Sequence, residues 1–172
     1  MSEFSISSPD FEEGGEIPEQ FGYKFENYPP AINHSNLPKG TKCTAIIMDD
    51  PDAMAAVGKV WVHWLEYFNF DYDLLQIPEK EWPTQWKVAT RENIQDLKEG
   101  KNLHLNQGKT DFGEIGYGGP APPDKRHTYI FKVYALDAHL VDLIEGYSKQ
   151  ELEDAMKGHI IAEAKLTGTY AP

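Results

Sequence analysis

Basic residues are scarce in this sequence, and cysteine is nearly absent. The 172 residues include 16 Lys and Arg against 28 Asp and Glu, so the formal net charge is −12 and the isoelectric point is about 4.8. Nucleic acids and anionic membrane surfaces are bound through basic patches, so this charge argues against both as main partners. A small anion is not excluded, because it responds to the local charges of its pocket. The single cysteine, Cys43, can form no intrachain disulfide, and its apolar neighbours predict a small buried hydrophobic side chain.

Long hydrophobic runs are also missing. No stretch approaches the ~20 apolar residues of a membrane-spanning helix, and the first residues show no basic segment followed by an apolar one, as a signal peptide would. We therefore expect a cytoplasmic protein without an integral membrane segment. With 40% hydrophobic and 26% charged residues, the composition is that of a soluble protein, and the length fits a single domain over residues 1–172.

The sequence lacks the compact motifs of common catalytic and metal sites. No GxSxG motif presents a nucleophilic serine, and no HExxH motif presents a zinc site. Asp52 and His63 could act as general base and acid in a hydrolysis, but no nucleophile or oxyanion-binding group accompanies them. We therefore expect no enzyme activity, no cofactor and no metal ion.

Hydrophobic patterns predict a mainly antiparallel β domain. Alternation or short apolar runs indicate strands at residues 4–8, 43–48, 60–68, 127–136 and 162–170. A capping box formed by Ser148 and Glu151 predicts one helix late in the chain. Residues 17–37 follow neither period and predict an irregular loop, whereas 91–98 could form a short helix. Several strands with one clear helix fit an antiparallel architecture.

Strict alternation also assigns side chains to faces of the predicted strands. In the strand at 60–68, one face would carry Trp61, His63, Leu65 and Tyr67, and the other Val62, Trp64 and Glu66. In the strand at 127–136, His127 would share its face with Tyr129, Phe131 and Val133. Both histidines would therefore lie among aromatic side chains.

A loop rich in glycine and proline, residues 111–123, leads directly into the strand at His127. Gly118 and Gly119 can adopt backbone angles closed to other residues, while the prolines that follow fix their own φ. Such a loop suits a preformed wall, and residues positioned by a rigid scaffold at the end of a loop are often functional. The alternative is that the loop is purely structural.

Two carboxylates and two imidazoles could form a polar cluster beside this loop. Asp50 and Asp52 follow one predicted strand, His63 lies in the next, and His127 ends the loop. A carboxylate bonded to one ring nitrogen fixes the tautomer of a histidine and raises its pKa, so that the imidazole can donate to an anion. Spacing alone leaves other interpretations open, because an Asp-Pro-Asp segment is often only a turn and a lone strand histidine is often a core residue.

Neighbouring groups could complete an anion pocket around these histidines. The backbone N–H groups of Gly118 and Gly119 could form a nest for the same anion. Trp61 and Tyr129 would supply aromatic walls, and the tyrosine would add a hydroxyl donor.

The motifs resemble those of the phosphatidylethanolamine-binding protein family, and in the same order. The matching segments are Asp50-Pro51-Asp52-Ala53, Trp61-Val62-His63-Trp64 and Gly118-Gly119-Pro120-Ala121-Pro122-Pro123, followed by His127 and Tyr129. Further similar segments run along nearly the whole chain, from Ser7-Ser8-Pro9 to Leu166-Thr167-Gly168-Thr169-Tyr170. The sequence is most similar to the bacterial and archaeal branch, often called Raf kinase inhibitor-like proteins.

This resemblance implies a mainly β fold: a β-sandwich with a large central antiparallel sheet, a smaller sheet and peripheral helices. It also implies a small surface pocket for phosphate-like or carboxylate anions, including phospholipid head groups. By match to the family motifs, the ligand-binding residues would be Asp50, Asp52, Trp61, His63, Gly118, Gly119, Pro120, His127 and Tyr129.

Two positions depart from the family motifs. Met54 replaces the last proline of a DPDxP segment, and Thr128 replaces the arginine usually found between the histidine and the tyrosine. We expect a looser turn at the first position and weaker anion binding from the second, with Arg126 as a partial substitute.

The function expected from the resemblance is that of a regulatory binding module for a small anionic or zwitterionic ligand. The alternatives are an inhibitor that binds a kinase or protease partner and, less favoured, a hydrolase that uses the Asp/His cluster. Aromatic residues between 67 and 86 could mark a homodimer surface, or could belong to a loop packed on its own domain.

Overall fold

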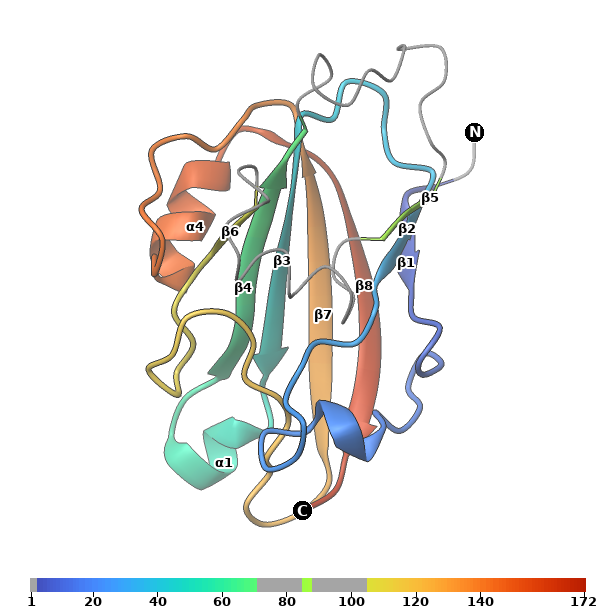
Figure 1. Ribbon diagram of the computed structural model, residues 1–172, viewed down its shortest axis with the longest axis vertical. Helices are drawn as coiled ribbons and strands as arrows, with labels where there is room; N and C mark the ends of the chain where they lie inside the picture. The colour runs from blue at the N-terminus through green and yellow to red at the C-terminus, as the bar shows by residue number, and fades with distance from the viewer. Residues whose placement is uncertain (1–2, 71–84, 88–104) are drawn as a thin grey trace.

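The computed structural model describes residues 3–70, 85–87 and 105–172, the short middle range by its backbone only. Within these residues the chain forms two antiparallel sheets (Figure 1). The five-stranded main sheet runs in the order β6 (Leu105–Gln107), β4 (Trp61–Asn69), β3 (Cys43–Asp50), β7 (His127–Leu136) and β8 (Ile160–Tyr170). The three-stranded small sheet runs in the order β1 (Ser5–Ser7), β2 (Asn33–Ser35) and β5 (Gln85–Lys87). The predicted mainly β architecture with a large and a small antiparallel sheet is confirmed.

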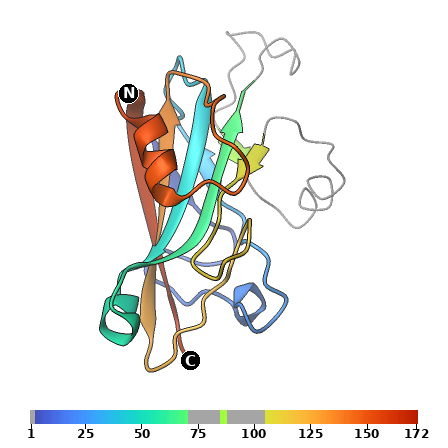
Figure 2. The same cartoon turned by 90° about the vertical axis from the view of Figure 1, so that its left-hand side faces the viewer.

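Apolar side chains cover both faces of the main sheet. On one face, Ile46, Met48 and Phe131 pack with Ile6 of β1 and with apolar residues of the N-terminal segment. On the other face, Ala45, Ile47 and Leu65 pack under helix α4 (Lys149–Met156), which Figure 2 shows lying along that face. This second cluster contains Cys43, which confirms the prediction of a small buried hydrophobic side chain, and burial raises the pKa of its thiol to about 12.

Helix α4 begins at the capping box that the sequence predicts. The Ser148 hydroxyl accepts a hydrogen bond from the backbone N–H of Glu151, and the Glu151 carboxylate accepts one from the backbone N–H of Ser148. Leu152 and Met156 form the buried face of the helix. Lys149 adds an ion pair, 2.8 Å from Nζ to Oδ2 of Asp49, which joins the first turn of the helix to the main sheet.

Three short elements lie in segments that the sequence pattern assigned to loops. The predicted irregular region 17–37 contains the single-turn helix η1 (Glu19–Phe21) and strand β2, and the loop after Asp52 contains helix α1 (Ala53–Val57). Each is only three to five residues long, which is too short to show a hydrophobic period. The helix expected at 91–98 and most of the aromatic stretch 67–86 lie outside the described residues.

The predicted faces of β4 are wrong at its first residues, because a β-bulge interrupts the alternation. Met48 pairs with Trp64, but the next residue of β3, Asp49, pairs with Val62, so His63 is the extra residue on β4. Val62 consequently packs on the α4 side of the sheet, whereas Trp64 is buried on the opposite side. The His63 ring also lies on the Trp64 side, in edge contact with Tyr129 of β7. The alternation predicted for β7 is confirmed, with Tyr129, Phe131 and Val133 in one cluster.

The described residues contain no helix that combines the length and the hydropathy needed to span a bilayer.

Candidate functional site

A cavity of about 240 Å³ lies where β3 ends and α1 begins, at one end of the main sheet (Figure 1). Three ionisable side chains line it: Asp50 from the end of β3, His63 from β4 and His127 from the start of β7. The rest of the wall is aromatic or aliphatic and consists of Ala53, Ala56, Val57, Trp61, Phe112, Ala121 and Pro123. The antiparallel pairing of β3 with both β4 and β7 brings the three ionisable residues to one end of the sheet.

His127 is held between two carboxylates. Its Nδ1 lies 2.7 Å from Oδ2 of Asp50, and its Nε2 lies 2.9 Å from Oδ1 of Asp124. Carboxylate oxygens only accept hydrogen bonds, so this geometry places a proton on both ring nitrogens and makes the ring an imidazolium. Burial opposes that charge, but the hydrogen bonds and charges of the two aspartates outweigh it, so the pKa of His127 is raised. The expected carboxylate-imidazole pair is present, and a second carboxylate joins it.

Asp124 is the ionisable residue at this site that the sequence interpretation missed. Its side chain is 45% exposed, whereas that of His127 is completely buried. The hydrogen bond from His127 lowers the pKa of the Asp124 carboxyl, which keeps it ionised near neutral pH. The available signal was its position, directly after the rigid Pro122-Pro123 pair and three residues before His127.

Asp50 and Asp52 also fix the backbone around the cavity. The second oxygen of Asp50, Oδ1, accepts a hydrogen bond of 3.1 Å from the N–H of Ala53, at the start of α1. Asp52 does not line the cavity; its Oδ2 accepts a hydrogen bond of 2.7 Å from the N–H of Thr128 and thereby ties α1 to β7. Asp50 thus lines the cavity, whereas Asp52 has the structural role of the turn interpretation.

His63 presents an acceptor rather than the donor that we expected. Its Nδ1 lies 2.7 Å from the carbonyl oxygen of Gly118, which can only accept, so the proton of the neutral ring lies on Nδ1. Burial lowers the pKa of His63, and the hydrogen bond to Gly118 and the charge of Asp50 offset this only in part. The ring is therefore neutral near pH 7, and its Nε2 carries a lone pair.

The glycine loop forms a wall, but its N–H groups do not form the expected nest. The N–H of Gly118 donates to the carbonyl oxygen of His63 at 2.8 Å, and the N–H of Gly119 donates to Oδ1 of Asn27 at 2.8 Å. Both donors are thus used within the protein, because the loop is hydrogen-bonded to β4 on one side and to the N-terminal segment on the other. The loop residues that line the cavity are Ala121 and Pro123 instead of Gly118, Gly119 and Pro120.

Aromatic residues surround the two imidazoles. Trp61 lines the cavity, and Phe112, which the sequence interpretation did not single out, contacts the rings of both Trp61 and His63 at 5.4 Å between centroids. Tyr129 packs behind the cavity wall, 5.1 Å from His63. Burial and the nearby charge of Asp50 raise the pKa of Tyr129, so its hydroxyl stays protonated. Trp61 Nε1 is a buried donor without a hydrogen-bond partner in the described part of the chain, whereas the buried Tyr129 hydroxyl lies near the Ala121 backbone and the Asp50 carboxylate.

The two departures from the family motifs have different structural consequences. Met54 lies in α1, where its N–H donates to the carbonyl of Pro51 at 3.2 Å, and its side chain is exposed. Arg126, expected as a partial substitute for the family arginine, binds away from the aspartates. Its guanidinium donates to Glu16 and Thr169 at 3.2 Å, because it lies over the N-terminal segment and the end of β8.

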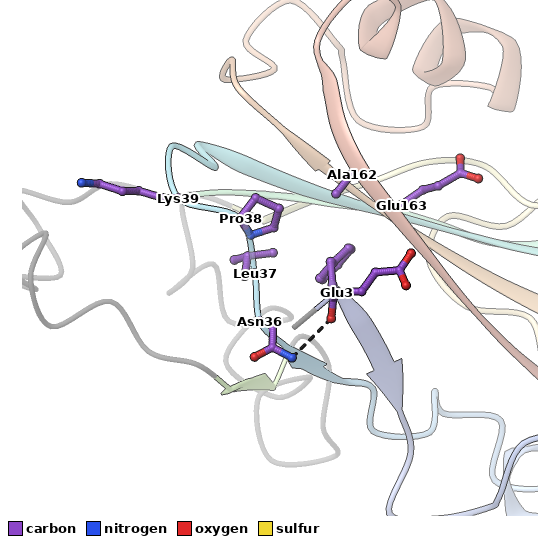
Figure 3. A pocket seen from close by; sticks show the side chains of 8 residues that line it. Glu3, Asn36, Leu37, Pro38, Lys39, Ala162 and Glu163 are labelled. Atoms are coloured by element: carbon purple, nitrogen blue, oxygen red, sulfur yellow. Dashed lines mark hydrogen bonds between the residues drawn. The ribbon is translucent and has the colours of Figure 1, made fainter. Parts of the chain in front are cut away.

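A larger open groove of about 660 Å³ lies at the opposite end of the main sheet, where β3 and β8 begin (Figure 3). Its charged residues are Glu3, Lys39 and Glu163, all at the surface, and the Asn36 amide donates to the backbone carbonyl of Glu3 at 3.3 Å. The described residues that line it include no histidine and no buried carboxylate. The cavity beside α1 is therefore the stronger candidate for a ligand site. Within residues 3–70 and 105–172, no group of three or more His, Cys, Asp and Glu side chains is arranged to hold a metal ion.

Comparisons with known proteins agree on one family. The sequence profile described as phosphatidylethanolamine-binding protein matches residues 7–171. A UPF0098 protein of Methanothermobacter thermautotrophicus is 37% identical over 160 residues, which cover 93% of each chain. A UPF0098 protein of Chlamydia trachomatis is 35% identical over 167 residues, or 96% of this chain and 97% of that one.

Solved structures show the same fold. The crystal structure of a phosphatidylethanolamine-binding protein homologue from Chlamydia trachomatis superimposes with a TM-score of 0.76 at 32% identity, covering 99% of this chain and 98% of the other. Escherichia coli YbcL, described as a new member of the mammalian family, gives a TM-score of 0.75 at 29% identity, covering 98% of both chains.

Proposed function

The chain belongs to the phosphatidylethanolamine-binding protein family, and from this membership we propose that it is a non-catalytic binding module. Its ligand is a small anionic or zwitterionic group, a phosphate ester or a carboxylate, bound in the cavity beside α1. The observation that carries the proposal is the contact of His127, a residue of the cavity wall, with the exposed carboxylate of Asp124, which lies beside the cavity and shows that this imidazole binds an anionic oxygen.

The chemistry of the wall favours a compact ligand with both donor and acceptor groups. About 240 Å³ with mostly aliphatic and aromatic lining has room for a head group or a small acid and little more. His127 offers an N–H donor, whereas neutral His63 offers an acceptor that suits an ammonium group or the hydroxyl of a protonated phosphate. Because Asp50 adds negative charge, a zwitterion such as phosphorylethanolamine should bind better than a naked dianion.

The experiment is an NMR titration of the ring signals of His63 and His127 between pH 5 and 8. Inorganic phosphate, phosphorylethanolamine and acetate are the soluble probes, and vesicles with and without phosphatidylethanolamine separate a membrane head group from a free phosphate ester. We expect saturable shifts of both rings, largest for phosphorylethanolamine. His127→Ala and the less disruptive His127→Gln should abolish the shift of His63, whereas His159→Gln, at an exposed position, should leave it unchanged. Equal binding by wild type and both His127 variants contradicts the proposal.

A second candidate is an inhibitor that binds a kinase or protease, and one observation favours it. Met54 and Val57 of α1 are each about half exposed, and Val57 also lines the cavity, so apolar side chains border its entrance. A partner segment with an acidic or phosphorylated residue could then use the rim and the cavity together. Competition of partner binding by free phosphate, and its loss in Met54→Lys, would support this function.

A hydrolase remains the least favoured function. Among the described residues, no serine, threonine or cysteine lines the cavity, and Asp52 already accepts a backbone hydrogen bond outside it. Turnover of an ester or phosphoester that is lost in Asp52→Asn would overturn this assessment.

A further inference from the structure

We propose that Asp124, which lies beside the cavity, is an internal ligand of His127, whose carboxylate competes with external anions for the Nε2–H of that ring. The inference rests on the proposed function and concerns the regulation of that site. It assigns to Asp124 the position that a bound carboxylate or phosphate oxygen would take.

The two aspartates on His127 differ in how firmly they are held. The Asp50 side chain is 4% exposed, and its second oxygen accepts the N–H of Ala53, so the protein fixes it from two sides. The Asp124 side chain is 45% exposed and comes from the loop before β7. An exposed side chain exchanges between rotamers within nanoseconds, so Asp124 can leave the ring while Asp50 cannot.

Exchange of Asp124 for an external anion conserves the hydrogen bonding of His127. The Nε2–H donates to an anionic oxygen before and after the exchange, and Asp50 keeps Nδ1 in both states. The released Asp124 carboxylate is hydrated by solvent, which limits the cost of its release. Addition of an anion without this release would place three negative groups around one imidazolium, so the release of Asp124 and the entry of the ligand are coupled.

This competition sets a threshold for binding. A tethered group has an effective concentration at its site of the order of millimolar or higher, so a free anion must exceed this to displace Asp124. Acetate is chemically equivalent to the Asp124 side chain and gains little by replacing it. A phosphate ester carries about −1.5 to −2 charges and three acceptor oxygens, so it competes more effectively. Asp124 lowers the apparent affinity of every competing anion by the same factor, so the weaker carboxylates need the higher concentrations to bind.

The test compares wild type with Asp124→Ala and Asp124→Asn by calorimetry and by the ring signals of His127 at pH 7. Inorganic phosphate, phosphorylethanolamine and acetate are the probes. Asp142→Asn, at an exposed position away from the cavity, controls for the change in net charge. We expect Asp124→Ala to bind all three probes more tightly by a similar factor of about ten, and Asp142→Asn to match wild type. The pKa of His127 should fall in both Asp124 variants, because each removes a negative charge that raises it and Asp124→Ala also removes the hydrogen bond.

Three outcomes are distinguishable. Tighter binding in the Asp124 variants supports the competition. If the wild type binds the probes and the Asp124 variants bind them equally or more weakly, with thermal stability unchanged, the competition is overturned. The proposed anion pocket is then still supported. No binding of any probe by wild type or either variant overturns the proposed function, and with it the role of Asp124.

Discussion

At the scale of single residues, the structure contains buried ionisable groups that respond to pH without belonging to the cavity. His34 of β2 is completely buried, and neither ring nitrogen has a hydrogen-bond partner among the described residues. Burial lowers its pKa from 6.5 to about 4. Glu66 of β4 is buried as well, and burial raises its pKa to about 7 despite hydrogen bonds from Gln107 and Trp64.

These two groups affect stability in opposite directions as the pH falls. The unfolded chain protonates His34 below about pH 6.5 and the folded chain only near pH 4, so His34 destabilises the fold progressively across this window, by roughly 3 kcal/mol at its acid end. Glu66 is protonated first in the folded chain, so between pH 7 and its unfolded value of 4.5 it stabilises the fold as the pH falls. The two contributions largely offset each other in the wild type.

We therefore predict that His34→Phe makes the free energy of unfolding depend on pH, because the contribution of Glu66 is then no longer offset. The variant removes the destabilising titration, so its free energy of unfolding relative to wild type should rise as the pH is lowered from 6.5 to 4. Urea denaturation at several pH values measures this difference, and His159→Phe, at an exposed histidine, is the control. A difference between His34→Phe and wild type that is constant over this window would show that His34 is not buried in its neutral form.

At the scale of elements, α1 is held in place by the two aspartates that flank Pro51, and it forms much of the cavity wall. Asp52 links the helix to β7 through the N–H of Thr128, at 2.7 Å. Asp52→Ala leaves this part-buried donor without an acceptor, so we predict a loss of about 1–3 kcal/mol in the free energy of unfolding. Because α1 would also loosen, amide exchange in Ala53–Val57 should accelerate and phosphorylethanolamine should bind less tightly. Asp142→Ala is the matched control, and amide exchange in α1 equal to that of wild type would contradict the prediction.

Elements with a strong local pattern could be predicted from sequence, and those formed by long-range contacts could not. The strands from Cys43, Trp61 and His127 show apolar runs or alternation, and the capping box at Ser148 is local. Strand β2, in contrast, is Asn33-His34-Ser35, which has no strand propensity and exists because β1 and β5 pair with it. The bulge at His63 likewise depends on the register with β3, so strict alternation assigned the first residues of β4 to the wrong faces.

The same distinction applies to the candidate site. The order of the motifs identified Asp50, His63 and His127, because the resemblance to the family predicted that these three residues lie in one pocket. The role of Asp124 depends on the path of one short loop. The expected glycine nest does not form because the N–H of Gly119 donates to Asn27, 92 residues away in the sequence. Neither could be read from spacing, since a hydrogen bond between distant segments leaves no local pattern.

At the scale of the whole molecule, the cavity wall is supported by the N-terminal segment. Four hydrogen bonds join residues 21–27 to the glycine loop: Gly119 N–H to Asn27, Tyr23 N–H to the Pro120 carbonyl, the Tyr117 hydroxyl to the Phe21 carbonyl, and the Tyr23 hydroxyl to the Glu114 carboxylate. Tyr23 also stacks on Phe112, a residue of the cavity wall, at 4.0 Å between centroids. Gly119 lies so close to this segment that a Cβ there would overlap the carbonyl oxygen of Phe21.

We predict that Gly119→Ala disturbs the site through this contact. The overlap is with backbone, which cannot move aside as a flexible side chain can, so the loop and the N-terminal segment must separate at a cost of about 1–3 kcal/mol. Urea denaturation measures this loss, and the ring signal of His63, whose Nδ1 donates to Gly118, should shift even without ligand. Gly40→Ala is the control: it introduces strain at a φ of 88° but meets no atom within 4 Å, so it should lower stability without moving the His63 signal. If both variants lose the same stability and neither shifts His63, the cavity does not depend on its contact with the N-terminal segment.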